Sequence, residues 1–350
     1  MLLSVKIRLM YRFYYLDVLR IMATIAVVMI HVTGMRWLQI DIYSIDWDVY
    51  NVCRAISRWA VPMFVLISGS LFLNSKTLNV KKIYGKNLVR ILVSFIFWYI
   101  IFAIFQTRGY ISEVLQHPLH YIGHLWFLIL IGALYVLLPL MRKIYENGGG
   151  KKALLLFVIL AFLFPSCLET IPFLLGVDVI QPQEMFYLKI VQKVLGWISY
   201  FMLGGYLGNL EVSWKKSLCL IPLFILLVLS SILVYQWYVL TNGHMVDEFY
   251  DNISITVLFE VICLFLIIKG IVPKTLRSKF CSEHIIVISG LTFGVYLTHM
   301  LFLPVITSFC ETRCLSSISL ILISMVFTMA LSMLLSSILN KVRIFKQFIV

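Results

Sequence analysis

Long apolar segments, separated by short polar connections, recur along the whole chain. A helix that crosses a bilayer needs roughly 20 mostly apolar residues. Ten segments fit this description: 15–35, 53–74, 87–106, 122–141, 152–168, 190–209, 217–238, 253–271, 285–306 and 315–340. The pattern predicts an all-α integral membrane protein with about ten transmembrane helices. The fifth segment is short and ends at Pro165, so nine or eleven spans are the alternatives.

The basic residues support an even number of spans. The N-terminus, the even-numbered connections and the C-terminus together hold 20 lysines and arginines, whereas the other connections hold four. Basic loops stay in the cytoplasm, so both termini are expected there. No connection is long enough for a soluble domain, and residues 1–350 are expected to form a single polytopic membrane domain.

Composition agrees with this topology. Hydrophobic residues make up 61% of the chain and charged residues 13%, against about 45–50% and about 25% in soluble domains. The net charge of +13 sits in short runs between apolar segments, which is typical of a membrane protein rather than a nucleic-acid-binding one. The seven cysteines form no CxxC pair and no Cys/His zinc spacing, so no metal site is expected.

The first segment carries three ionisable residues, Asp17, Arg20 and His31. Each such residue within a span costs roughly 2.5–3.5 kcal/mol on insertion scales and needs a reason. Asp17 and Arg20 are three apart and can pair. His31 lies three turns beyond Arg20, about 16 Å along the helix and on the same face. The alternative is an anchoring ion pair near the cytoplasm and a histidine that merely packs.

Other ionisable residues are expected at a similar depth in the outer part of the membrane. His299 lies about 21 Å into the ninth segment and His31 about 24 Å into the first. Arg58 in the second segment and Glu260 in the eighth are placed at comparable depth, and His124 and Trp126 begin the fourth at the outer interface. Such convergence indicates a water-accessible cavity. The alternative is a structural ion pair, for example between Arg58 and Glu260.

Five stretches resemble the membrane-bound acyltransferase 3 family, in the family's order and on the expected helices. They are YYLDVLRIMATIAVVMIH with Arg20 and His31, SRWAVPMFVLISGSLFL with Arg58, RILVSFIFWY with Arg90, HLWFLILIGALYVLLPL with Trp126, and FGVYLTHMLF with Tyr296 and His299. The resemblance covers about residues 14–340, nearly the whole chain.

This resemblance implies an activity that composition alone does not. Members of the family move an acyl group, usually acetyl, from cytoplasmic acyl-CoA to a hydroxyl of a cell-envelope glycan. The chain resembles the stand-alone members, which act on surface polysaccharide or its lipid-linked precursor in the bacterial plasma membrane. Acyl-CoA is then a donor substrate, and no permanently bound cofactor is expected.

Acyl transfer from a thioester to an alcohol needs a base for the alcohol proton and donors for the developing oxyanion. His31 is the expected base, or alternatively the group that carries the acyl between donor and acceptor. Arg20, held by Asp17, and Arg90 lie near the cytoplasm and are suited to the phosphates of the coenzyme. The acceptor side is expected to be lined by His299, Tyr296, Arg58, Glu260 and Trp126.

Two other kinds of protein share these features. Buried charges and ten spans also occur in transporters and flippases that export a polysaccharide or a small solute. The chain contains no evident internal repeat, which weakly opposes a transporter. A structural or sensory membrane protein without catalytic activity is the third alternative.

The topology is directly testable by cysteine substitution. Cysteines at Asp46 or Asp247, in connections predicted to be external, should react with membrane-impermeant thiol reagents added to intact cells. Cysteines at Lys81 or Lys274 should not react, because those connections are predicted to be cytoplasmic. Labelling of the opposite pair would overturn the assignment.

Overall fold

The protein is described by a computed structural model in which all regular elements of the described residues are helices. The described residues are 14–107, 111–147, 149–165, 182–243, 245, 251–272, 279–313 and 315–349. The side chains of 111, 182–188 and 279–282 are outside this description. The chain divides into two compact units, one formed by Met1–Ser75 and Lys143–Ser289, the other by Lys76–Arg142 and Gly290–Val350.

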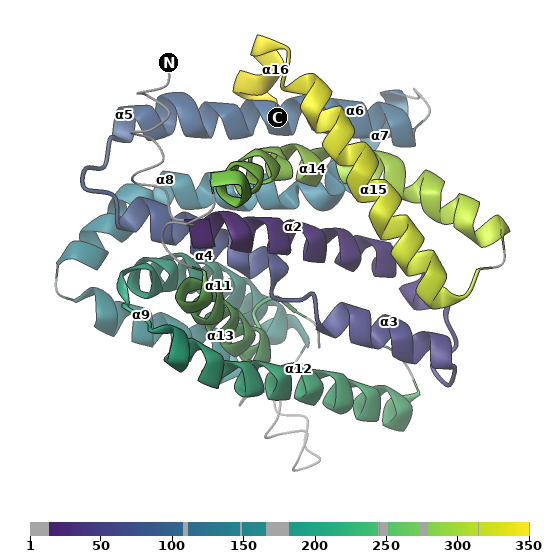
Figure 1. Cartoon of the computed structure of the whole chain (residues 1–350), viewed down its shortest axis with the longest axis horizontal. Coiled ribbons are helices and arrows are strands. Elements are labelled where there is room, and N and C mark those ends of the chain that lie inside the picture. The colour runs from purple at the N-terminus through teal and green to yellow at the C-terminus, as the bar shows by residue number, and fades with distance from the viewer. Residues whose placement is uncertain are drawn as a thin grey trace. The chain divides into compact units, whose positions relative to one another are not determined.

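The first unit contains the helices of the first, second, fifth, sixth, seventh and eighth predicted spans (Figure 1). Its elements are α2 (Tyr14–Gly34), the 3-10 helix Trp37–Gln39, α3 (Ile45–Ala55), α4 (Ala60–Leu73), α9 (Gly150–Val158), the π-helix Ile159–Leu163, α11 (Pro182–Asn209), α12 (Trp214–Asn242) and α13 (Ile255–Ile271). Within this unit α4 packs on α11 and on α2, and α12 packs on α13 and α3.

The second unit holds the helices of the third, fourth, ninth and tenth predicted spans. Its elements are α5 (Val80–Lys82), the π-helix Ile83–Leu88, α6 (Val89–Gln106), α7 (Ile111–Gln116), the 3-10 helix His120–Leu125, α8 (Trp126–Glu146), α15 (Ser317–Leu339) and α16 (Arg343–Phe348). The last residues of α8 belong to the first unit, and α14 (Lys279–Thr312) contributes Lys279–Ser289 to the first unit and the remainder to the second.

Serines set the starts of several helices. Ser44, Ser213, Ser254 and Ser316 precede α3, α12, α13 and α15, and each side chain accepts a hydrogen bond from the backbone N–H three residues on. These bonds satisfy a donor that the first helical turn leaves open. Gly243, with φ of 71°, ends α12 in the left-handed conformation that glycine adopts without strain.

The helices α4 and α11 approach each other at the level of their backbones. A Cβ added at Gly69 would overlap the carbonyl of Phe201, and one added at Gly204 would overlap the carbonyl of Leu66. Gly69 of α4 thus meets α11 three residues before Gly204, and Gly204 of α11 meets α4 three residues before Gly69. This reciprocal pattern is that of two antiparallel helices. The small-residue spacing Gly204-x-x-x-Gly208 predicts such packing, and the structure confirms it: Gly208 lies against Ser70 and Asn74 of the same partner.

The second predicted span, 53–74, contains a turn near its start. The chain is helical in α3, turns at Ile56–Trp59, and resumes as α4. Pro62 favours the break, because its ring clashes with the carbonyl four residues earlier, at Arg58, in a regular helix. The Ser57 hydroxyl donates to the carbonyls of Cys53 and Arg54, at 2.8 and 3.0 Å, and so satisfies the end of α3.

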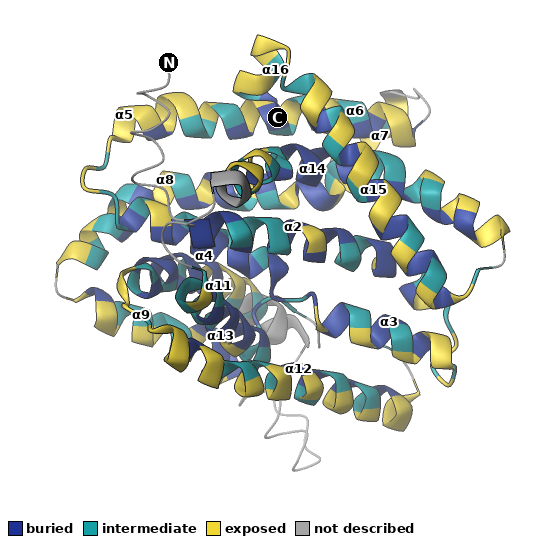
Figure 2. Ribbon diagram, in the orientation of Figure 1, coloured by how far each residue is buried: buried dark blue, intermediate teal, exposed yellow. Residues whose placement is uncertain are grey.

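Exposed apolar side chains follow the long helices in a way that fits lipid contact. On α12 they include Leu223, Ile225, Leu226, Leu229 and Leu233, and α6 and α15 show similar exposed faces (Figure 2). A protein that is not covered by lipid or a partner rarely exposes apolar surface on this scale.

Seven helical stretches within the described residues are long and apolar enough to cross a membrane. They correspond to the first four, the seventh, the ninth and the tenth predicted spans. The helix α13 has 17 residues, and the fifth predicted span is a short α-helix that passes into a π-turn at Ile159. Residues 166–168 of that span, like Asp247 and Lys274, lie outside the described residues. The chain is an all-helical multi-pass membrane protein, and the number ten stays a prediction.

The backbone contact between α4 and α11 predicts a position-specific sensitivity to alanine. Gly204→Ala should lower the thermal unfolding temperature and the yield of folded protein in detergent, because the added methyl meets the Leu66 carbonyl. Overpacking of this kind typically costs 1–3 kcal/mol.

Gly132→Ala is the matched control for this experiment. Gly132 is also buried in a helix, but a Cβ there meets Leu88 and Ile91 side chains at 3.6 and 3.8 Å, which is ordinary contact. Both substitutions gain the same helix propensity. Equal unfolding temperatures for the two variants would show that the α4–α11 contact is looser than described.

Candidate functional site

The helix α2 carries the predicted donor-side residues Asp17, Arg20 and His31. It forms readily, because its 21 residues are mostly apolar and Asp17 lies in the first turn, where a negative charge is favourable. One face of α2 is buried, and Asp17 belongs to it with an exposed fraction of 4%. A carboxylate buried to this degree requires compensating partners.

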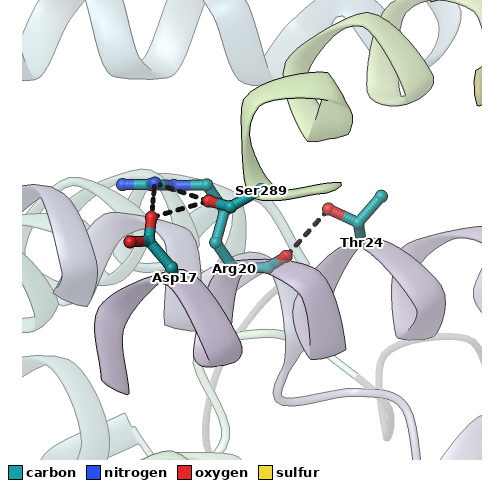
Figure 3. A network of polar contacts seen from close by, with 4 residues as sticks. All are labelled: Asp17, Arg20, Thr24 and Ser289. Carbon is teal, nitrogen blue, oxygen red and sulfur yellow. Dashed lines mark hydrogen bonds and ion pairs between the residues drawn. The ribbon is translucent and has the colours of Figure 1, made fainter. Parts of the chain in front are cut away.

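Asp17, Arg20 and Ser289 form a closed ring of hydrogen bonds (Figure 3). Nη1 of Arg20 donates to Oδ1 of Asp17 at 3.0 Å and to Oγ of Ser289 at 3.1 Å. The Ser289 hydroxyl in turn donates to Oδ1 of Asp17 at 2.7 Å. The predicted pairing of Asp17 with Arg20 is therefore confirmed, and Ser289, which the sequence did not single out, joins it from α14.

Arg20 is more accessible than its partners. Its side chain is 28% exposed, against 5% for Asp17. The Arg20 backbone carbonyl accepts a further bond from Thr24 Oγ1 at 2.8 Å, an ordinary arrangement for threonine within a helix. A guanidinium that is positioned by hydrogen bonds and still partly exposed is suited to an anionic ligand.

His31 lies in the last turn of α2, half-buried. The helix is uninterrupted from Arg20 to His31, so the separation of about 16 Å expected from helical rise applies. The side chains of Arg20 and His31 therefore lie at different depths along α2.

Glu260 and Arg58, both predicted for the acceptor side, also belong to the first unit. Glu260 on α13 is 1% exposed, and its Oε1 accepts a hydrogen bond from Ser231 of α12 at 3.2 Å. Its Oε2 is buried and has no hydrogen-bond partner among the described residues. Arg58 is half-buried in the turn between α3 and α4 rather than within a helix. The carboxylate of Glu260 is thus bonded to a serine and not to Arg58.

The second unit brings together three residues around His299. His299 on α14 is fully buried, and its ring centroid lies 4.9 Å from that of His124 in an edge-to-face arrangement. The Tyr296 hydroxyl donates to the His124 backbone carbonyl at 2.6 Å. Phe102 packs against the His124 ring with centroids 4.8 Å apart, so the imidazole pair sits in aromatic surroundings.

The hydrogen bonds of His299 fix its neutral tautomer. Nδ1 contacts the backbone carbonyls of Tyr296 and Val295, at 2.7 and 3.2 Å. A carbonyl oxygen only accepts, so Nδ1 carries the proton and Nε2 holds the lone pair.

Arg90 and Trp126 complete the predicted set and lie in the second unit. The Arg90 guanidinium carbon is 4.9 Å from the centroid of the Phe293 ring, a cation–π contact between α6 and α14. Trp126 begins α8 and is 38% exposed, as expected for a residue at the membrane interface.

The structure therefore gathers the predicted residues into two groups. In the first unit Asp17, Arg20 and the unpredicted Ser289 form one cluster, and in the second Tyr296 and His299 form another with His124. No group of three or more histidine, cysteine or acidic side chains suited to a metal ion occurs within the described part of the chain.

Fold and buried polar groups together define a multi-pass helical membrane protein with ionisable side chains inside its helices. The family model of the acyltransferase domain matches residues 13–337, so the chain belongs to the acyltransferase 3 family. The matched region runs through both units, and the resemblance predicted from the five sequence stretches is confirmed.

Curated relatives come from Staphylococcus aureus. Proteins of strains MSSA476, MRSA252 and Mu50, each named "Probable poly-beta-1,6-N-acetyl-D-glucosamine export protein", are 23% identical to this chain over 308 residues. The match covers 85% of this chain and 83% of each relative. No solved structure matches the chain significantly.

The bond from Tyr296 to the His124 carbonyl generates a prediction. Tyr296→Phe should lower the unfolding temperature, because losing a buried hydrogen bond of this kind costs about 1 kcal/mol. It should also reduce activity, since the bond ties the His120–Leu125 segment to α14 beside His299. Both are measured on purified protein.

Tyr84→Phe provides the matched control for the Tyr296 variant. The Tyr84 hydroxyl also donates to a backbone carbonyl in the second unit, that of Val136 at 3.0 Å, but at an exposed position away from the histidines. Its loss should leave activity unchanged. Equal activity in both variants would remove Tyr296 from the site.

Proposed function

We propose that the protein is a membrane-bound O-acyltransferase. It moves an acyl group, most simply acetyl, from cytoplasmic acyl-CoA to a hydroxyl of a cell-envelope polysaccharide or of its lipid-linked precursor. Membership of the acyltransferase 3 family supports the reaction class. The relatives support a polysaccharide acceptor, because their names refer to a polymer of N-acetylglucosamine.

The observation that carries this proposal is the arrangement along α2. Arg20 is held near the start of the helix by Asp17 and Ser289, and His31 lies three turns further on. The adenosine phosphates of acyl-CoA bind at Arg20, while the pantetheine arm carries the thioester toward His31. The length of the coenzyme matches a site whose anionic and reactive ends are about 16 Å apart.

His31 removes the proton of the acceptor hydroxyl as the hydroxyl oxygen attacks the thioester carbonyl. The thioester C–S bond then breaks, and the proton passes to the departing coenzyme thiolate. In the alternative, the imidazole takes the acyl group first and passes it to the acceptor. The acceptor is bound with contributions from His299, Tyr296, Arg58, Glu260 and Trp126.

The proposed topology places these groups in a bacterial plasma membrane. Ten spans with both termini in the cytoplasm put the start of α2, with Arg20, on the side where acyl-CoA is made. Both units act as a single acyltransferase domain over residues 1–350, with the bilayer as solvent and without a nucleic-acid partner or a permanently bound cofactor.

Substitution of His31 tests the catalytic role. His31→Ala should reduce transfer of radiolabelled acetyl from acetyl-CoA by about 10²–10⁴-fold, because a general base typically contributes that much. The variant should still insert and still bind acetyl-CoA. Arg20→Ala should instead raise the KM for acetyl-CoA, since its role is phosphate contact. Near-normal transfer by His31→Gln would leave His31 as a packing residue.

Export of a polysaccharide is the second candidate function, favoured by the relatives' printed names. It differs in what His31→Ala does to cells. An exporter should continue to deliver polymer to the cell surface in that variant, and purified wild-type protein should transfer no acetyl. If the protein is an acyltransferase, cells with His31→Ala should carry surface polymer that lacks the acyl group.

A further inference from the structure

The hydroxyl of Ser289 occupies a defined position between two charged groups. An arginine only donates hydrogen bonds and a carboxylate only accepts them. The Ser289 oxygen therefore accepts from Arg20 Nη1, at 3.1 Å, and donates its proton to Asp17 Oδ1, at 2.7 Å. Both roles of the hydroxyl are used within the ring.

Nη1 of Arg20 is held by two partners, Asp17 of its own helix and Ser289 of α14 (Figure 3). A guanidinium presents its donors in a rigid fork that suits an oxyanion. Fixing its orientation in advance lowers the ordering cost of ligand binding.

The bond between Arg20 and Asp17 lies within α2. Ion pairs spaced three or four residues apart on one helix typically contribute only about 0.3–0.5 kcal/mol. Ser289 comes from α14, far away in sequence, and is 4% exposed. It adds a tertiary restraint to a side chain that α2 alone would leave mobile.

Two other buried serines of the first unit bond to backbone alone. Ser217 of α12 donates to the carbonyl of Leu266 in α13 at 2.9 Å, and Ser199 donates to the carbonyl of Leu195 in its own helix at 2.7 Å. Ser289 contacts two charged side chains, one of them partly exposed. This contrast separates a positioning role from ordinary packing.

We propose that Ser289 is a positioning residue for the anionic part of the acyl donor: together with Asp17 it orients the Arg20 guanidinium, which binds the coenzyme phosphates. The inference rests on the proposed role of Arg20 in binding acyl-CoA. Ser289 itself touches neither the thioester nor the acceptor.

The test uses the full-length protein in detergent and measures KM and kcat for acetyl-CoA, with direct binding of acetyl-CoA as a second readout. Ser289→Ala should raise KM about 5- to 20-fold, the order expected when a charge-assisted hydrogen bond is lost. The kcat should stay within about twofold of wild type. Ser289→Cys keeps the size of the side chain but bonds weakly, so it should raise KM similarly and replaces the alanine variant if that fails to fold.

A double-mutant cycle decides between positioning and packing. In an Arg20→Ala background, Ser289→Ala should cause no further rise in KM, because the group it positions is gone. Ser217→Ala, the matched buried serine, should leave KM unchanged. Ser289→Thr, which keeps the hydroxyl, should return KM toward the wild-type value.

Three results would overturn the inference. A Ser289→Ala variant with wild-type KM, beside an Arg20→Ala variant with raised KM, would remove Ser289 from the site and leave the proposed function intact. An equal further rise in the Arg20→Ala background would make Ser289 a packing residue. Unchanged acetyl-CoA binding in Arg20→Ala itself would overturn the role of Arg20 and this inference together.

Discussion

A charge inside an apolar helix persists only where other groups of the protein bond it, and this constraint organises the polar interior of the molecule. The carboxylate of Asp17 is bonded by Arg20 and Ser289, and that of Glu260 by Ser231. In each case a serine of another helix supplies a neutral donor, which bonds the carboxylate without bringing in a further charge that must be desolvated. Where the bonds cross between helices, they also define which helices must stay together.

The sequence predicted what is local and missed what is distant. Asp17 and Arg20 are three residues apart, so their pairing follows from helical periodicity alone. Ser289 is 269 residues from Arg20, and its helix also carries Thr292, Thr298 and Thr307, any of which has a similar hydroxyl. Which of these hydroxyls bonds to Arg20 and Asp17 is determined by how the helices pack. The break before α4 was only partly within reach of prediction: Pro62 disfavours a regular helix through Arg58, but Pro139, Pro222 and Pro304 lie inside helices that continue through them.

The two histidines of the predicted site differ in how much the sequence could predict about them. His31 is placed by the length of one uninterrupted helix, so its distance from Arg20 was predictable. The ring of His299 is oriented by bonds to the carbonyls of its own helix, and its neighbour His124 comes from a short 3-10 segment. Gly123, with φ of 47°, interrupts that segment, and irregular backbone of this kind leaves no periodic pattern to read.

The contact between α4 and α11 has a mechanical consequence. At Gly69 and Gly204 the two helices meet through glycine and an opposing backbone carbonyl, so no side chain at these two points can repack to let one helix roll against the other. The helices α4 and α11 therefore move as one rigid pair. A carrier that alternates between inward-open and outward-open states needs helices that slide or rock against each other, and the contact between α4 and α11 does not allow this. Any conformational change that moves a substrate through the protein must therefore occur between other helices.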